Sequence, residues 1–195
     1  MNVIHQHKII FLHVPKNAGT SILKAFGQQR GNHEKWYYYK EKYPKEWGEY
    51  FKFAIIRNPW DRVVSNYEYA KMGKSYWHSV DGNAVYGIHK DYDLLKDRTF
   101  QECVHLLKNN RKRFKHPGWE PQFSFICNKK YMPQVKILKY ENLTKEFNDI
   151  FPEIKLPTLN ESKKGKDYKK YYNQETKGII ANIYKKDIEI FKYLF

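Results

Sequence analysis

The sequence predicts an α/β fold built on a parallel β-sheet. Three short apolar runs, at 8–14, 51–57 and 135–139, have the composition of strands buried on both faces. Between and after these runs, apolar residues recur at helical spacing. Strands that alternate with helices favour a parallel sheet with right-handed crossovers, whose ligand sites lie at the carboxyl ends of the strands.

The first half of the chain predicts two strand–helix units. The strand at 8–14 is broken at Pro15 and is followed by a helix over 20–26. The strand at 51–57 is followed by Asn58, a favoured N-cap, and then by proline, which suits the first position of a helix. The polar and aromatic stretch 27–50 between these units predicts a long, functional loop.

The second half predicts further helices around the third strand. Thr99 and Glu102 have the spacing of a capping box, so we expect a helix there that runs to about residue 107. Pro121 is expected at a helix start. Asn173 is expected to cap one last helix, whose apolar face is formed by Ile180, Tyr184, Ile188 and Phe191.

Length and composition predict a single domain, 1–195, with no apolar run long enough to span a membrane. The N-terminus lacks the pattern of a signal peptide. Cys103 and Cys127 lie among apolar residues, so we expect two buried thiols in a reducing compartment, although one disulfide is possible by count. No cluster has the spacing of metal ligands.

The chain is strongly basic: 36 Lys and Arg against 21 Asp and Glu give a formal net charge of +15. Such a charge implies an anionic partner, which could be nucleic acid, an acidic polysaccharide, a membrane surface or a phosphorylated cofactor. Charge alone does not choose among these classes.

One motif lies between the first strand and its helix: His13-Val-Pro-Lys16-Asn17-Ala18-Gly19-Thr20-Ser21. Small residues let the backbone wrap closely, so that its N–H groups can converge on an anion, while Lys16 adds a cation and the two hydroxyl groups add donors. It is not a Walker A loop, which needs two glycines with Lys-Ser/Thr directly after the second. His13 is expected to pack or to orient Lys16.

A second motif follows the second strand: Arg57-Asn-Pro-Trp-Asp61-Arg62-Val-Val-Ser65-Asn-Tyr67. Arg57 ends a strand at the same sheet edge as the first motif, and Ser65 lies about two helical turns further on. Both could bind one phosphate, with Arg57 making paired hydrogen bonds to it. Asp61 and Arg62 are expected to form structural ion pairs.

Together the two motifs resemble those of the sulfotransferases that use 3′-phosphoadenosine 5′-phosphosulfate (PAPS). More narrowly, they resemble those of the carbohydrate branch that contains heparan sulfate 2-O-sulfotransferase and small bacterial relatives. It extends to Pro121-Gln122, to Tyr140-Glu-Asn-Leu143 and to the C-terminal region, and so covers nearly the whole chain. It implies a P-loop-like three-layer fold with a central parallel sheet flanked by helices.

The resemblance also implies roles for individual residues. Lys16, Asn17, Ala18, Gly19, Thr20 and Ser21 would surround the 5′-phosphosulfate, with Lys16 on the leaving oxygen. Arg57 and Ser65 would hold the 3′-phosphate. Lys163, Lys164 and Gly165 fall where relatives have a loop that closes over this phosphate. No metal is implied.

His33 is the candidate general base, because it lies where relatives place a histidine and because histidine ordinarily titrates near neutral pH. Glu34 and His116 are the alternatives. Relatives often carry a histidine directly before the Pro-Gln pair, whereas here that place reads Gly118-Trp-Glu.

The sequence therefore predicts a PAPS-dependent sulfotransferase that acts on a hydroxyl, most simply that of a carbohydrate. Without a membrane anchor, it would be a cytoplasmic enzyme of bacterial or viral origin, with no specific nucleic-acid partner. An ATP-dependent phosphotransferase is the first alternative, although it would need a Walker lysine and an acidic magnesium ligand. The other alternative is a basic nucleic-acid- or glycan-binding module without catalysis.

Overall fold

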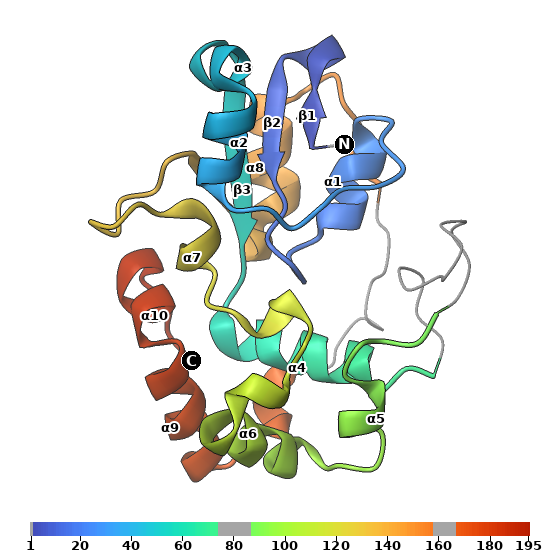
Figure 1. The fold of residues 1–195 in the computed structure, drawn as a ribbon, viewed down its shortest axis with the longest axis vertical. Helices are drawn as coiled ribbons and strands as arrows, with labels where there is room; N and C mark the ends of the chain where they lie inside the picture. Colours follow the sequence, from blue (N-terminus) through green and yellow to red (C-terminus); the bar gives the residue numbers. More distant parts are fainter. Residues whose placement is uncertain (1, 74–86, 158–166) are drawn as a thin grey trace.

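A four-stranded sheet forms the upper half of the molecule (Figure 1). The computed structural model describes residues 2–73, 87–157 and 167–195. The strand order is β1-β2-β3-β4, with β1 antiparallel to β2 and the other pairs parallel. The strands are β1 (Val3–Ile4), β2 (Ile9–Leu12), β3 (Phe51–Ile56) and β4 (Lys136–Lys139). The three predicted parallel strands are confirmed, and β1 adds a short antiparallel edge.

Helices cover both faces of the sheet, so the predicted three-layer α/β architecture is confirmed (Figure 1). Phe11 and Phe53 point to one face and pack against α1 (Gly19–Ala25) and α8 (Leu143–Ile150). Leu12 and Ala54, the next residues along the strands, point to the other face. That face is covered by α2 (Trp36–Lys42), α7 (Phe123–Ile126) and α10 (Lys185–Phe191).

A separate helical core lies beyond the carboxyl ends of the strands, in the lower half of Figure 1. It joins α4 (Pro59–Ala70), α6 (Phe100–Asn109) and α9 (Gln174–Ile183). Helix α4 begins as predicted, because the Asn58 side chain accepts a hydrogen bond from the Trp60 N–H and Pro59 occupies the first turn. The remaining elements are α3 (Pro44–Glu49), α5 (Tyr92–Leu95) and 3₁₀ turns at His5–His7, Arg111–Arg113, Pro117–Trp119, Tyr140–Asn142 and Tyr168–Tyr171.

Two predictions about secondary structure are wrong. The stretch 27–50 is not a plain loop, because it contains α2 and α3, and Tyr39 of α2 is buried against the sheet. The predicted last helix is broken at Tyr184 into α9 and α10. The capping by Asn173 is correct, since its side chain accepts from the Thr176 N–H.

The break at Tyr184 has a tertiary cause. Its hydroxyl group donates to the Trp119 carbonyl at 2.9 Å, and the side chain is buried. Helix α10 then carries the buried Asp187 to the backbone N–H groups of Gln122 and Phe123, both at 2.8 Å. The break therefore ties the C-terminus to the segment that supports the site described below.

Both cysteines are buried and free, as expected from their apolar neighbours. Burial raises the pKa of the Cys103 thiol to about 12. Among the helices in the described residues, none combines the length and the apolar character needed to cross a lipid bilayer.

Candidate functional site

The two sequence motifs meet at the carboxyl edge of the sheet. Strands β2, β3 and β4 are parallel and in register, with Leu12 opposite Ala54 and Ile56 opposite Lys139. The segments that leave them therefore emerge side by side, between the sheet and the helical core (Figure 1). In open α/β sheets this edge is where ligands bind.

The loop after β2 has a constrained backbone. Lys16 and Ala18 both have positive φ, 70° and 59°, a conformation that residues with a Cβ adopt only at a cost of about 1–3 kcal/mol. Gly19 follows, and a Cβ at Gly19 would lie 1.8 Å from the His13 Nε2. The close packing of the His13 ring against the first turn of α1 therefore requires glycine at position 19. The positive φ angles of the loop occur at Lys16 and Ala18 instead.

The Lys16 ammonium group lies among other cations. The residue as a whole is half-buried, and burial of its ammonium group lowers the pKa from 10.5 to about 7. The positive charges of Arg57 and Arg62 lower this pKa further. An aromatic ring faces this group: Nζ lies 3.7 Å from the ring centre of Tyr69.

Arg57 binds the same loop from the end of β3. Its Nη1 donates to the Lys16 carbonyl at 3.2 Å, and its guanidinium group stacks on the Tyr140 ring with 4.1 Å between the Cζ atom and the ring centre. Arg57 also makes two hydrogen bonds to Asp61, from Nε at 2.7 Å and from Nη2 at 2.9 Å. These contacts use three of its five N–H bonds.

Arg62 does not form the ion pair expected for it, because Asp61 pairs with Arg57 instead. Arg62 is buried, and its Nε donates to the Pro15 carbonyl at 3.0 Å while Nη1 donates to the Glu120 carbonyl at 2.8 Å. Burial lowers the pKa of its guanidinium group. Arg62 therefore fixes the start of the Lys16 loop and adds a buried positive charge beneath it.

Gln122 joins both motifs, a role that the sequence analysis missed. Its Oε1 accepts from the Asn17 Nδ2 at 2.7 Å and from the Arg57 N–H at 2.9 Å. Its Nε2 donates to the Arg57 carbonyl at 2.8 Å, and the residue is fully buried. Asn17 also donates to the Ile55 carbonyl at 2.7 Å. The side chains of Asn17 and Gln122 thus lock the lysine loop onto the end of β3.

Replacing Gln122 with leucine should therefore destabilise the protein strongly. Gln122→Leu leaves the buried N–H and C=O groups of Arg57 without these partners, which costs about 1–3 kcal/mol for each group. We expect a loss of about 3 kcal/mol and a fall in Tm of about 6–12 °C. Thermal unfolding measures this fall in Tm. Gln29→Leu, at an exposed position, is the control and should keep the parent's Tm. A Gln122→Leu variant with the parent's Tm would contradict this role.

The remaining predicted donor residues are less closely connected. Thr20 and Ser21 lie in the first turn of α1, half-buried and buried respectively. Ser65 lies in α4 and is half-buried. In the described residues no hydrogen bond joins Ser65 to Lys16 or Arg57. Lys163, Lys164 and Gly165 lie outside the described residues.

His33 is held in a defined orientation beside the loop. Its Nδ1 lies 3.0 Å from the His13 carbonyl oxygen. Because a carbonyl group only accepts, Nδ1 carries the hydrogen, and the neutral ring has its lone pair on Nε2. The centres of the His13 and His33 rings are 4.3 Å apart. The His13 ring packs against Gly19, as expected, and its carbonyl group orients His33. Burial, followed by the effect of His33, holds the pKa of His13 well below 6.5.

His116 and Glu34, the alternatives to His33, have different environments. The His116 ring lies 6.2 Å from that of His33, and its Nδ1 accepts from the Gly118 N–H at 3.0 Å. The neutral His116 ring therefore carries its hydrogen on Nε2, the opposite tautomer to His33. Glu34 is close enough to Tyr39, on the α2 side, for its charge to raise the pKa of that phenol further after burial.

The lowered pKa of Lys16 predicts a specific dependence of stability on pH. The folded protein binds fewer protons at Lys16 than the unfolded chain does between pH 7 and 10.5. The cost of burying this charge is fully present below about pH 7 and disappears as the pH rises through that window. Relative to Lys16→Met, the parent should gain stability from pH 7 to pH 9, measured by denaturant unfolding. A difference that stays constant with pH would contradict the environment described.

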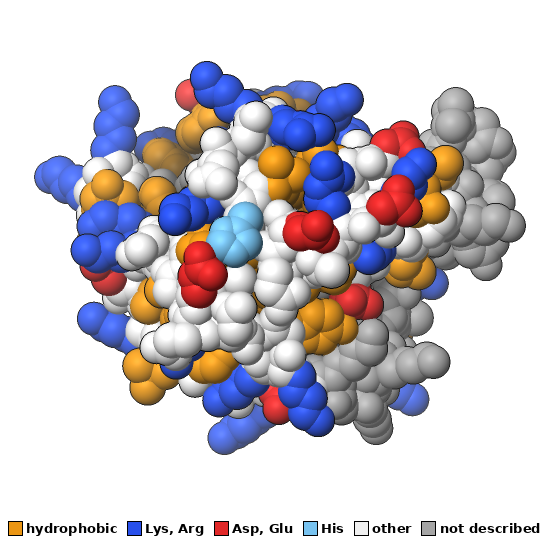
Figure 2. Space-filling model, turned by 90° about the horizontal axis from the view of Figure 1, so that it is seen from below, with side chains coloured by type: hydrophobic (Ala, Val, Ile, Leu, Met, Phe, Trp, Pro, Cys, Tyr) orange, Lys and Arg blue, Asp and Glu red, His pale blue; other side chains and the backbone are white. Residues whose placement is uncertain are grey.

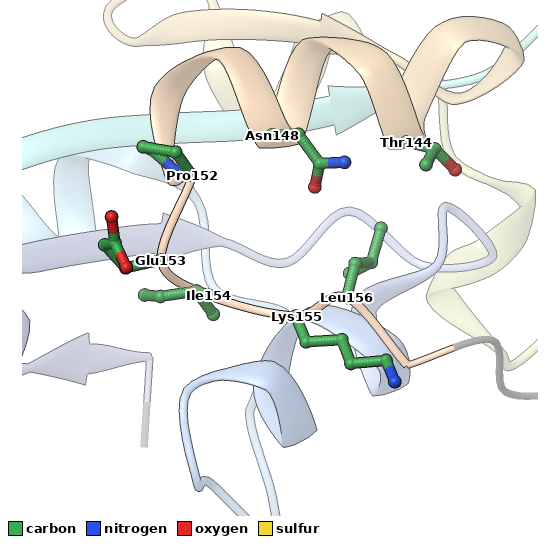
Figure 3. A pocket seen from close by; sticks show the side chains of 7 residues that line it. All are labelled: Thr144, Asn148, Pro152, Glu153, Ile154, Lys155 and Leu156. Carbon is green, nitrogen blue, oxygen red and sulfur yellow. The ribbon is translucent and has the colours of Figure 1, made fainter.

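One surface pocket lies away from these residues. It is found between α8 and the chain that follows it (Figure 3), and its lining consists of Thr144, Asn148, Pro152, Glu153, Ile154, Lys155 and Leu156. It contains none of the predicted site residues, so we assign it no role. In the part of the chain that the structure describes, no three His, Cys, Asp or Glu residues are grouped so as to hold a metal ion.

The comparison with protein families agrees with the two motifs and their position in the fold. The family model described as "Sulfotransferase family" matches residues 1–194. The chain therefore belongs to the sulfotransferase family. No curated protein and no solved structure gives a significant match.

Proposed function

We propose that this sulfotransferase takes its sulfonate group from PAPS and moves it to a hydroxyl group of a carbohydrate. The observation that carries the proposal is the convergence of Lys16 and Arg57 at one sheet edge, joined by the 3.2 Å hydrogen bond between them. The family match over residues 1–194 supports sulfonate transfer by one domain that spans the chain.

The residues at this edge suit a phosphorylated donor. Lys16, Arg57 and Arg62 bring three cations together, and Asp61 is the acid that pairs with one of them. Burial, and then the positive charges of Arg57 and Arg62, lower the pKa of Lys16, and a bound anion would offset both effects. Arg57 keeps two N–H bonds beyond those it spends on Asp61 and on the lysine loop.

PAPS, when bound, supplies an activated sulfonate whose leaving group is a phosphate oxygen. Lys16 would stabilise the negative charge that develops on this oxygen, together with the N–H groups of Asn17, Ala18, Gly19, Thr20 and Ser21. Arg57 and Ser65 would hold the 3′-phosphate. The constrained Lys16 loop would hold its N–H groups in position before PAPS binds.

His33 would act as the general base. Its Nε2 lone pair can take the proton of the acceptor hydroxyl group, because the hydrogen bond to the His13 carbonyl keeps the hydrogen on Nδ1. The tautomer of His116 leaves no lone pair on its Nε2 and engages its Nδ1 with Gly118. These hydrogen bonds favour His33 over His116 for this role.

The acceptor class is tested by following label from [³⁵S]PAPS into three unsulfated polysaccharides: heparosan, chondroitin and hyaluronan. We expect transfer to at least one of them, with 4-nitrophenol as the small phenolic control. Label that enters only the phenol would contradict a carbohydrate acceptor. On the face seen in Figure 2, Lys and Arg side chains are scattered among acidic, apolar and other groups and form no continuous basic patch.

A further inference from the structure

The Tyr69 ring lies between Lys16 and two histidines of the candidate site. Its ring centre is 3.7 Å from the Lys16 Nζ on one side. On the other side it makes edge contacts with two histidine rings, at 5.2 Å to His89 and 6.4 Å to His116. His116 in turn lies 6.2 Å from His33. One aromatic ring thus links the lysine to the histidines.

We propose that Tyr69 is a positioning residue, whose ring face holds the Lys16 ammonium group in place and keeps it charged. The importance of this contact for catalysis rests on the proposed function. The contact itself does not, because it exists in the protein without any substrate.

A ring face is an effective partner for this cation. Lys16 carries no ion pair in the described residues, and Asp61, the one carboxylate in the two sequence motifs, is engaged by Arg57. A desolvated ammonium group over an aromatic face gains more than an exposed one, because water competes less. The ring therefore offsets part of the cost that burial imposes on Lys16.

Two buried histidines hold the Tyr69 ring in place. His89 and His116 are buried and lie 4.5 Å apart, and each accepts a backbone N–H at Nδ1, from Asp91 and Gly118 respectively. Neither ring is free to rotate without breaking such a bond. The histidines thus fix the Tyr69 ring, and the ring can in turn fix the position of the flexible Lys16 side chain.

Several charged or titratable groups surround Lys16. Arg57 comes from the end of β3, and Arg62 and Asp61 come from α4. His89 and His116 contact the Tyr69 ring. Tyr69→Phe removes the hydroxyl group of Tyr69 and keeps its ring face. A change in the titration of Lys16 that occurs in Tyr69→Leu and not in Tyr69→Phe can therefore be attributed to the loss of the ring.

The test measures the titration midpoint of Lys16 directly, by NMR of the protein carrying ¹³C-labelled lysine, with Lys16→Met to assign the signal. In Tyr69→Leu the midpoint should fall by about one pH unit, whereas Tyr69→Phe, which keeps the ring face, should stay close to the parent. Tyr37→Leu, at an exposed tyrosine on α2, is the matched control and should leave the midpoint unchanged. Tyr69→Met replaces the leucine variant if that variant does not fold.

The catalytic consequence is read from the pH profile of kcat/KM for PAPS, which reports groups of the free enzyme. The alkaline limb should move to lower pH in Tyr69→Leu and not in Tyr69→Phe. An unchanged Lys16 midpoint in both Tyr69→Leu and Tyr69→Met would overturn the positioning role. A shifted midpoint in a protein that shows no preference for the donor nucleotide would support that role and contradict only the proposed function.

Discussion

Lys16→Ala should lower turnover by about 10²–10³-fold while leaving the affinity for 3′,5′-bisphosphoadenosine (PAP) within about tenfold. The reason is that, in the proposed mechanism, Lys16 would act on charge that develops only as the sulfonate is transferred, whereas Arg57 and the loop backbone would bind the nucleotide in every state. Steady-state turnover with [³⁵S]PAPS gives the first quantity, and calorimetric titration with PAP gives the second.

The matched control for this experiment is Lys185→Ala, because the Lys185 side chain is 70% exposed on α10. It changes the net charge by the same amount and should keep the parent's turnover. If Lys16→Ala and Lys185→Ala turn over equally fast, Lys16 does not contact the leaving oxygen. If Lys16→Ala instead loses PAP binding outright, the lysine acts in binding rather than in the transfer step.

His33→Ala should lower kcat by about 10²–10⁴-fold, the range that a positioned general base contributes, with little effect on PAP affinity. The hydrogen bond from Nδ1 to the His13 carbonyl is the structural reason, since it presents Nε2 as the proton acceptor. Added imidazole should restore part of the activity of His33→Ala, because it can enter the space left by the ring.

Two further variants separate His33 from its alternatives. Glu34→Gln should keep most of the activity. His116→Ala should lower stability, because it removes the partner of the Gly118 N–H, and should show no rescue by imidazole. A His33→Ala enzyme as active as the parent would exclude His33 as the base. Rescue of His116→Ala alone would assign the base to His116.

Much of the fold follows from local patterns in the sequence. The runs around Phe11 and Phe53 are apolar on both faces because helices cover both faces of the sheet, and Asn58 and Asn173 cap helices with their own side chains. The break at Tyr184 could not be predicted in this way. The apolar spacing continues through it, and a distant hydrogen bond, to the Trp119 carbonyl, marks the break.

The candidate site could be predicted only in part, for the same reason. Lys16 and Arg57 belong to segments that leave adjacent parallel strands, so their proximity follows from the topology. Gln122 and Tyr69 were missed because their roles depend on long-range contacts, to Asn17 and Arg57 in one case and to Lys16 in the other. A glutamine directly after a proline at a helix start was the only local signal for Gln122.

The central claim is that this sheet edge binds a 3′-phosphorylated adenine nucleotide. The most direct test compares the Tm of the protein with saturating PAP, 5′-AMP and ATP at equal concentrations. At 100 times Kd, PAP should stabilise the protein by about 2.7 kcal/mol, a rise in Tm of roughly 5–11 °C, with a much smaller rise for AMP and ATP. Equal shifts for PAP and AMP, or a larger one for ATP, would contradict the donor site described here.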